Sequence, residues 1–221
     1  MKKDLTEQLF YRITNTTLIF LVINLHFLLA NFLFFACLLL FELRIENILI
    51  YLVAFIPTGP AIAASFASMG KLIEDGDINA TATFFKSYKQ NFWVSLKFWL
   101  SQLALISIFL FNYIYIREFS TLTFLIPLFL ALLMVILLAN LYAFPILIRF
   151  NITVKNLWII SIISLYKYWR HTLINTTLTI AFLFLYFHYP LIVMLSFASV
   201  APYLIMYNLR RLVKDIGKDY Q

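Results

Sequence analysis

Charged residues are scarce in this chain of 221 residues. Only 12% of the residues are Asp, Glu, Lys or Arg, whereas about 25% is typical of soluble domains. Hydrophobic residues make up 63%, and several uninterrupted apolar runs reach the ~20 residues that a helix needs to cross the hydrocarbon core of a bilayer. This composition excludes a soluble globular domain and predicts an all-α, polytopic integral membrane protein.

Residues that usually carry catalysis are also sparse. Cys37 is the single cysteine and lies within an apolar run, so no internal disulfide can form, and we interpret it as a small apolar filler. The sequence contains no Gly-x-Ser-x-Gly motif and no phosphate-binding loop of the Gly-x-x-x-x-Gly-Lys type. The three histidines, His26, His171 and His188, have no partners at metal-ligand spacing. We therefore expect no catalytic residue, no metal, no cofactor and no enzymatic activity.

Acidic residues are missing from the apolar runs. All ten Asp and Glu residues fall in predicted loops or tails. Proton- and cation-coupled carriers usually place a carboxylate at membrane depth, as a relay or a ligand. The sequence therefore disfavours an ion-coupled carrier.

Six membrane spans are predicted within one transmembrane domain that comprises residues 1–221. Tyr189 and Pro190 divide the last apolar stretch, which is too long for a single crossing. The approximate spans are residues 18–41, 48–69, 93–116, 121–148, 173–188 and 190–209.

The positive residues are distributed unevenly between the two sides of this arrangement. If the N-terminus is cytoplasmic, 15 of the 17 Lys and Arg residues lie on the cytoplasmic side, and only Arg44 and Arg117 lie outside. Cytoplasmic loops of membrane proteins carry such an excess, so we expect both termini to be cytoplasmic. The basic residues that give the net charge of +7 lie beside apolar spans and form no soluble patch. A nucleic-acid partner is therefore not expected.

The second predicted span contains an unusual cluster of helix-breaking and small residues. Proline removes backbone donors and bends or breaks a helix, and glycine loosens it further. A broken helix in a membrane can line a cavity, or its kink can bring small residues close to a neighbouring helix. We favour close packing. The residues of this cluster are Pro57, Thr58, Gly59, Pro60, Ala61, Ala64 and Ser68.

Two predicted cytoplasmic segments combine aromatic and basic residues in an amphipathic pattern. Such segments anchor at lipid headgroups or bind a protein partner, and both interpretations stay open. The first aromatic-basic segment comprises residues 84–92, with Phe84, Phe85, Lys86, Tyr88, Lys89, Asn91 and Phe92 as candidate docking residues. The second aromatic-basic segment comprises Tyr168, Trp169, Arg170 and His171.

Four asparagines fall inside the predicted spans. Asn24 and Asn31 are seven residues apart, so they lie on one helix face and should point at neighbouring helices. Asn112 and Asn140 lie in the third and fourth spans. Together the four could line a polar path through a pore.

Several of these strings resemble the YesL family of bacterial membrane proteins, whose molecular function is unassigned. The resemblance is carried by residues 24–29, by residues 57–61 with Ala64 and the acidic loop behind them, and by the two aromatic-basic segments. It implies a six-helix protein of the bacterial plasma membrane that is associated with carbohydrate uptake. We therefore expect a non-enzymatic accessory subunit of an ABC-type sugar transporter, with the permease or ATPase subunits as partners. The alternative is a stand-alone pore or facilitator for a small neutral solute.

Overall fold

The computed structural model describes residues 5–118 and 120–218, and every regular element within these ranges is a helix. This confirms the predicted all-α class. Lys2 and Lys3, which the charge count places in the cytoplasm, lie outside the described residues. The α-helices are α1 (Leu5–Ala30), α2 (Phe32–Leu40), α3 (Ile48–Ala54), α4 (Thr58–Asp75), α5 (Ala80–Glu118), α6 (Ile126–Leu147), α7 (Val154–Lys167), α8 (Trp169–His188), α9 (Pro190–Met194) and α10 (Phe197–Lys218). Two 3-10 turns, η1 (Ile45–Asn47) and η2 (Ser120–Leu125), precede α3 and α6.

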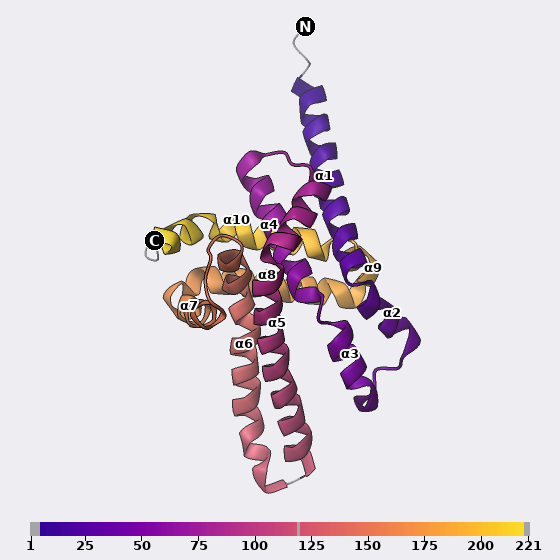
Figure 1. The fold of residues 1–221 in the computed structure, drawn as a ribbon, viewed down its shortest axis with the longest axis vertical. Coiled ribbons are helices and arrows are strands. Elements are labelled where there is room, and N and C mark those ends of the chain that lie inside the picture. Colours follow the sequence, from indigo (N-terminus) through magenta and orange to yellow (C-terminus); the bar gives the residue numbers. More distant parts are fainter. Residues whose placement is uncertain (1–4, 119, 219–221) are drawn as a thin grey trace.

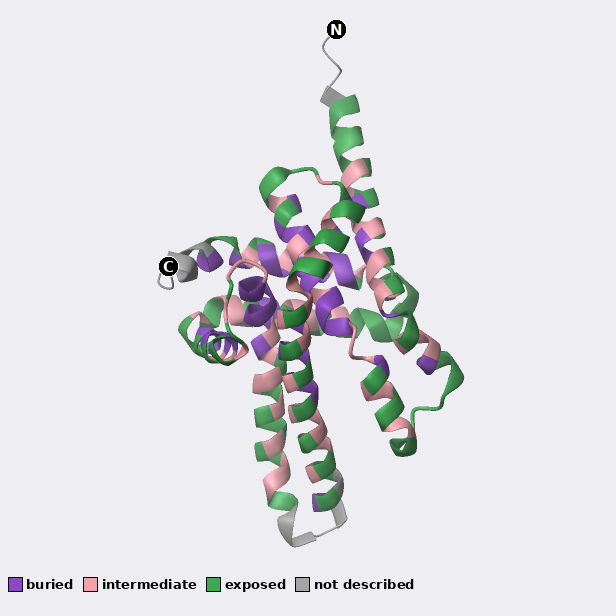
Figure 2. Cartoon of the chain, in the orientation of Figure 1, coloured by how far each residue is buried: buried purple, intermediate pink, exposed green. Residues whose placement is uncertain are grey.

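Helix α4 lies at the centre of the molecule. It packs most extensively against α5 and α10, and also contacts α1 and α6. Twelve of its 18 residues are buried, because its many Ala, Ser and Gly side chains allow neighbouring helices to approach closely. Figure 2 shows the buried residues gathered where α4 meets its neighbouring helices. The far halves of the α5–α6 hairpin and of α1 are mostly exposed or half-buried (Figure 2).

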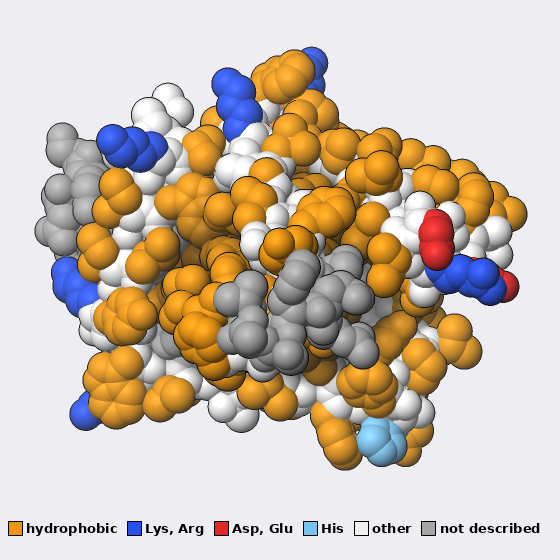
Figure 3. All heavy atoms as spheres, turned by 90° about the horizontal axis from the view of Figure 1, so that it is seen from below, with side chains coloured by type: hydrophobic (Ala, Val, Ile, Leu, Met, Phe, Trp, Pro, Cys, Tyr) orange, Lys and Arg blue, Asp and Glu red, His pale blue; other side chains and the backbone are white. Residues whose placement is uncertain are grey.

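The helices do not form one parallel bundle. Helices α5 and α6 lie side by side as a long hairpin, and α1 extends to the opposite end of the molecule (Figure 1). Helices α8 and α10 instead run across this direction, joined by the short α9 (Figure 1). Seen from the tip of the α5–α6 hairpin, the surface is covered largely by hydrophobic side chains, with charged ones near its edge (Figure 3).

Three helical stretches in the described chain are long and apolar enough to cross a membrane: Glu7–Ala30, Ala80–Tyr113 and Thr123–Leu147. A fourth is obtained if Ile45–Ala54 and Thr58–Asp75, which are bent by 46° at their junction, form one broken span. Helices α8 and α10, which correspond to the fifth and sixth predicted spans, are not among these candidates. The membrane class is thus supported, while the six-span count stays a prediction.

Helix α5 is much longer than the predicted third span of residues 93–116. It contains 39 residues, which at ~1.5 Å per residue gives roughly 58 Å, about twice the hydrocarbon thickness of a bilayer. The first aromatic-basic segment is therefore the beginning of this helix and not a separate surface element. Residues 98–116 carry no charged side chain and are long enough for one crossing.

Candidate functional site

The break between α3 and α4 is a built feature with its own hydrogen bonds. Helix α3 ends at Ala54, and the carbonyl of Phe55 accepts a hydrogen bond of 2.8 Å from the indole Nε1 of Trp99 on α5. Pro57 precedes α4 directly, and Pro60 lies in the first turn of α4, where a backbone donor is not needed. Only Pro57 is thus positioned to interrupt the helix. The carbonyl of Phe55 at the break accepts hydrogen bonds from both the Trp99 indole and the backbone N–H of Thr58.

Gly59 allows α4 and α5 to touch at the break. A Cβ atom added at Gly59 would lie 2.3 Å from the Cβ of Trp99 and 2.5 Å from its Cγ, far inside van der Waals contact. Thr58, Pro60, Ala61, Ala64 and Ser68 are all buried as well. This geometry agrees with the close-packing interpretation of the cluster.

The break in the first predicted span meets the break in the second. Helix α1 ends at Ala30 and α2 begins at Phe32, so Asn31 is the residue between them. The Oγ1 of Thr58 donates a hydrogen bond of 2.5 Å to the Oδ1 of Asn31, and the Asn31 Nδ2 donates to the carbonyl of Phe27 at 2.8 Å. Asn31 and Thr58 are 1% and 4% exposed, so this link between two broken helices lies in the interior.

Asn24 bridges a third interruption, between α9 and α10. Its Nδ2 donates to the carbonyl of Met194, the last residue of α9, at 2.8 Å. Its Oδ1 accepts from the backbone N–H of Ala198, in the first turn of α10, at 3.0 Å. One buried amide therefore satisfies the end of one helix and the start of the next, groups that helix termini otherwise leave unpaired.

Asn112 and Asn140, the other two asparagines of the predicted spans, do not lie at helix breaks. The Nδ2 of Asn112 bonds to the carbonyl of Ile108, and that of Asn140 bonds to the carbonyl of Leu137, each within its own helix. The four asparagines thus have separate partners in separate parts of the fold.

The first aromatic-basic segment is divided between interior and surface. Phe84 is 1% exposed and packs in a core cluster with Ile19, Ile23 and Met69, so it is not available as a surface docking residue in this structure. Phe85 is 52% exposed, and Lys86 and Lys89 are exposed beside it. Tyr88, Asn91 and Phe92 are half-buried.

The second aromatic-basic segment divides in the same way at the α7–α8 junction. Trp169 is 57% exposed, and the Arg170 guanidinium lies 5.6 Å from the centre of its ring. Tyr168 is the residue between the two helices and is half-buried. His171 turns inward, with its Nδ1 2.9 Å from the Oδ1 of Asn208 on α10.

Several polar residues of the interior were not predicted from the sequence. Asn208 also donates to the Oδ1 of the buried Asn175 at 2.8 Å, and the hydroxyl of Tyr142 lies 2.8 Å from that of Thr172. Asn175 lies in the predicted fifth span, so its polarity within an apolar run was the available signal. Trp99 gave no such signal, because a tryptophan in an apolar helix is ordinarily read as lipid-facing or core.

These features define an all-helical membrane protein in which buried amides and one indole join interrupted helices. Residues 16–113 match the sequence profile of a family described as "Protein of unknown function, DUF624". The matched region runs from α1 into α5 and includes Asn24, Asn31, the α3–α4 break and the first aromatic-basic segment. No curated protein and no solved structure matches the chain.

Proposed function

We propose that this chain is a non-enzymatic, multi-pass protein of a bacterial plasma membrane, of the YesL type, that serves as an accessory subunit of an ABC-type carbohydrate importer. The match of residues 16–113 to a family described as of unknown function supports the YesL resemblance. The partners in this proposal are the permease or ATPase subunits, and both termini of the chain face the cytoplasm.

The exposed part of the first aromatic-basic segment is the observation that carries this proposal. Phe85 presents about half of its surface, with two lysine side chains beside it, at the start of a helix longer than a bilayer is thick. Aromatic residues and arginine are enriched at protein contact sites, so the exposed ring of Phe85 is the part of this surface that favours a partner. Trp169 and Arg170 supply a second surface of the same kind.

The pore alternative receives less support from the geometry. A polar path needs amides that face one common channel, whereas Asn24 and Asn31 are each 1% exposed and their amides are bonded at helix breaks. Asn112 and Asn140 bond within their own helices.

The test compares two exposed phenylalanines of the same helix. The tagged chain is purified in a mild detergent from cells in which its sugar importer is expressed, and permease and ATPase subunits are identified by mass spectrometry. We expect Phe85→Ala to reduce their recovery at least fivefold. Phe111→Ala, at a position that is 57% exposed on the same helix, should leave it unchanged.

Deletion of the gene supplies the functional half of the test. Sugar uptake should fall when the chain is absent and recover with the wild-type chain, but not with the Phe85→Ala variant. Unaltered uptake in the deletion strain, together with purified protein free of importer subunits, would contradict the proposed role.

A further inference from the structure

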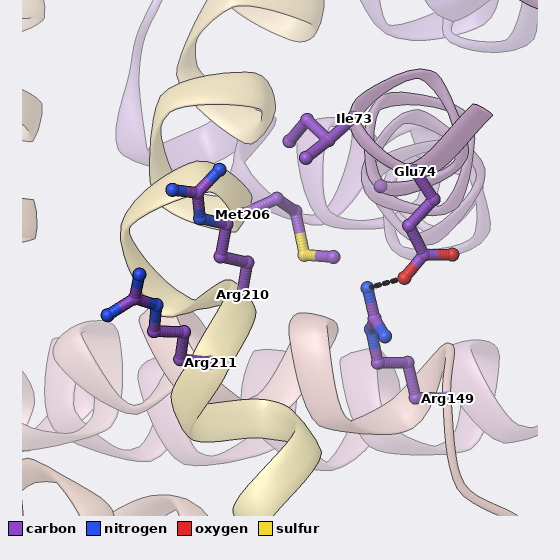
Figure 4. A pocket seen from close by; sticks show the side chains of 7 residues that line it. Ile73, Glu74, Arg149, Met206, Arg210 and Arg211 are labelled. Carbon is purple, nitrogen blue, oxygen red and sulfur yellow. Dashed lines mark hydrogen bonds and ion pairs between the residues drawn. The ribbon is translucent and has the colours of Figure 1, made fainter. Parts of the chain in front are cut away.

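A cavity of about 620 Å³ opens between α4, α10 and the end of α6. It belongs to neither aromatic-basic segment and to none of the helix breaks. Its walls are formed by Gly70, Ile73, Glu74, Arg149, Met206, Arg210 and Arg211. Figure 4 shows Met206 reaching from α10 into the space that separates this helix from the Glu74–Arg149 pair.

The lining of the cavity is strongly positive. Three arginines face one carboxylate, so the charge of the walls is not balanced from within. Arg149 and Glu74 form an ion pair of 2.6 Å, in which an Nη of Arg149 donates to the Oε1 of Glu74. A guanidinium carries five N–H donors, so this pair leaves Arg149 with further donors for a second anion.

Arg149 is the less exposed of the two side chains in this ion pair. Its side chain is 21% exposed, against 45% for Glu74. A cation that is largely withdrawn from water interacts with an incoming anion more strongly than a fully solvated one does. Arg149 therefore has the environment of a binding residue and not of a loosely held surface charge.

Arg210 and Arg211 line the same cavity from α10, and their side chains extend from this helix on the side away from the ion pair (Figure 4). The Arg210 guanidinium lies 4.2 Å from the centre of the Tyr207 ring, and this contact limits where its long side chain can move. Guanidinium groups bind phosphate oxygens in a bidentate manner, and this geometry makes arginine the preferred residue for phosphate recognition.

Gly70 lines the cavity where α4 approaches α10. A Cβ at Gly70 would lie 2.7 Å from the Cε of Met206, so the absence of a side chain leaves room for Met206. A second cavity of about 290 Å³ adjoins the first, shares Gly70, Glu74, Arg149 and Met206 with it, and is also lined by Lys71 and Asp75. Lys71 and Asp75 form an ion pair of 4.0 Å, so the second cavity adds no net charge to that of the three arginines.

We propose that this cavity binds a phosphate group at Arg149, with Arg210 and Arg211 at the α10 edge of the cavity adding positive charge. The phosphate belongs either to the headgroup of an anionic lipid or to a soluble phosphate compound. By the charge count, every Lys and Arg except Arg44 and Arg117 lies on the predicted cytoplasmic side, so the positive residues around the cavity lie there too, where both sources occur. This proposal does not rest on the accessory role proposed above.

The test has one arm for each source and uses the full chain purified in a neutral detergent. For the lipid, equal amounts of phosphatidylglycerol and phosphatidylcholine are added, and the ratio retained by the protein is measured by native mass spectrometry. For the soluble compound, inorganic phosphate is titrated and the broadening of its ³¹P resonance is measured. We expect the wild-type chain to give a signal in at least one arm.

The variant R210Q/R211Q should reduce that signal at least tenfold, and because both arginines are exposed the substitution should leave the fold intact. The matched control R44Q/K155Q removes the same charge at exposed positions elsewhere and should leave the signal within twofold of the wild type. Glu74→Gln should strengthen binding, because it removes the carboxylate that competes for Arg149.

Each outcome decides the question. A loss confined to the phosphatidylglycerol arm identifies a lipid headgroup, and a loss confined to the ³¹P arm identifies a soluble phosphate. Equal losses in R210Q/R211Q and in R44Q/K155Q would show a general charge effect and overturn the proposal. So would the absence of a signal from the wild-type chain in both arms.

Discussion

At the scale of single residues, the interior of this protein is organised by side chains that take over backbone hydrogen bonds. Helix interruptions leave carbonyl and N–H groups unpaired, and an apolar surrounding offers no water to satisfy them. Asn24 supplies the missing partners between α9 and α10, Trp99 adds a donor to the Phe55 carbonyl, and Asn31 links its break to Thr58 through a side-chain hydrogen bond. These residues therefore connect elements far apart in the sequence.

The Asn24 bridge predicts a large cost for a small substitution. In Asn24→Ala, the carbonyl of Met194 and the N–H of Ala198 both lose their partner in a buried site. A buried unpaired group costs about 1–3 kcal/mol, so we expect a loss of about 2–4 kcal/mol in the free energy of unfolding. Titration with SDS in mixed micelles, followed by circular dichroism, measures this quantity.

Asn112→Ala is the control for that experiment. The Asn112 amide bonds only to the Ile108 carbonyl within its own helix, which already accepts helical hydrogen bonds. We expect a change below about 0.5 kcal/mol, as for substitutions outside special features. Equal losses in the two variants would show that Asn24 is not a bridge.

The two glycines of α4 form a second matched pair. The added Cβ in Gly59→Ala would collide with the Cβ and Cγ of Trp99, which cannot move without moving α5. We expect overpacking to reduce the free energy of unfolding by about 1–3 kcal/mol. The same measurement in micelles tests it.

In Gly70→Ala the nearest atom is instead the Cε of Met206, at the flexible end of a side chain. Because Met206 can rotate and alanine favours a helix by up to about 1 kcal/mol over glycine, the net change should be near zero. A greater loss for Gly70→Ala than for Gly59→Ala would contradict this account.

At the scale of elements, the sequence predicted where the chain is helical better than where helices are interrupted. The Pro57–Pro60 cluster identified one break, and Tyr189–Pro190 lies at the end of α8. The break at Asn31 has no proline or glycine, so local propensity gave no sign of it. Its hydrogen bond from Thr58, 27 residues away, is a tertiary contact that no local pattern contains.

The aromatic-basic segments show the same limit. Their amphipathic pattern was visible in the sequence, but the direction of each ring depended on how α5 and α8 pack. Phe84 and Phe85 are neighbours, yet one is 1% and the other 52% exposed. In the second segment, Trp169 is 57% exposed, whereas His171 contacts Asn208 on α10.

The α3–α4 break gives a prediction at this scale. Trp99→Phe keeps an aromatic ring next to Phe55 and Phe144 but removes the Nε1 donor from the carbonyl of Phe55. We expect a loss of about 0.5–1.5 kcal/mol in the free energy of unfolding, the net value of one hydrogen bond, because the Phe55 carbonyl keeps the backbone N–H of Thr58 as a second donor at 3.2 Å.

Trp158→Phe serves as the comparison, since the Trp158 indole donates to the hydroxyl of Ser101. A hydroxyl can rotate toward another partner, and Ser101 already lies 2.7 Å from the carbonyl of Phe98. We therefore expect the smaller loss for Trp158→Phe. The reverse order would show that the backbone N–H of Thr58 alone satisfies the Phe55 carbonyl when Trp99 is replaced.

At the scale of the whole molecule, the open question is the path of residues 169–218 relative to the membrane. The charge count and the apolar run predict that this region crosses twice, with the turn near Tyr189 outside. Yet α8 and α10 run across the α5–α6 hairpin (Figure 1), and neither is among the stretches long and apolar enough to span. Four crossings and six crossings both leave the C-terminus on the side of the N-terminus, so the location of the C-terminus does not distinguish them.

The turn between α8 and α9 does distinguish them, and single cysteines can report it. Cys37 is the only native cysteine and is buried, so Cys37→Ala provides a background without thiols. In that background we expect a membrane-impermeant maleimide, added to intact cells, to label Leu43→Cys at the predicted outer turn. Ala82→Cys, on the predicted cytoplasmic side, should be labelled only after the membrane is opened. Both positions are exposed, so access and not burial decides the result.

Phe187→Cys is then the decisive variant, because Phe187 is 81% exposed next to the turn. Six spans predict labelling from outside, as for Leu43→Cys. Four spans predict protection until the membrane is opened, as for Ala82→Cys, and would make α8 to α10 a layer on the cytoplasmic side. In that second case the apolar surface of α8 would lie along the membrane and not through it, and the predicted spans 173–188 and 190–209 would be wrong.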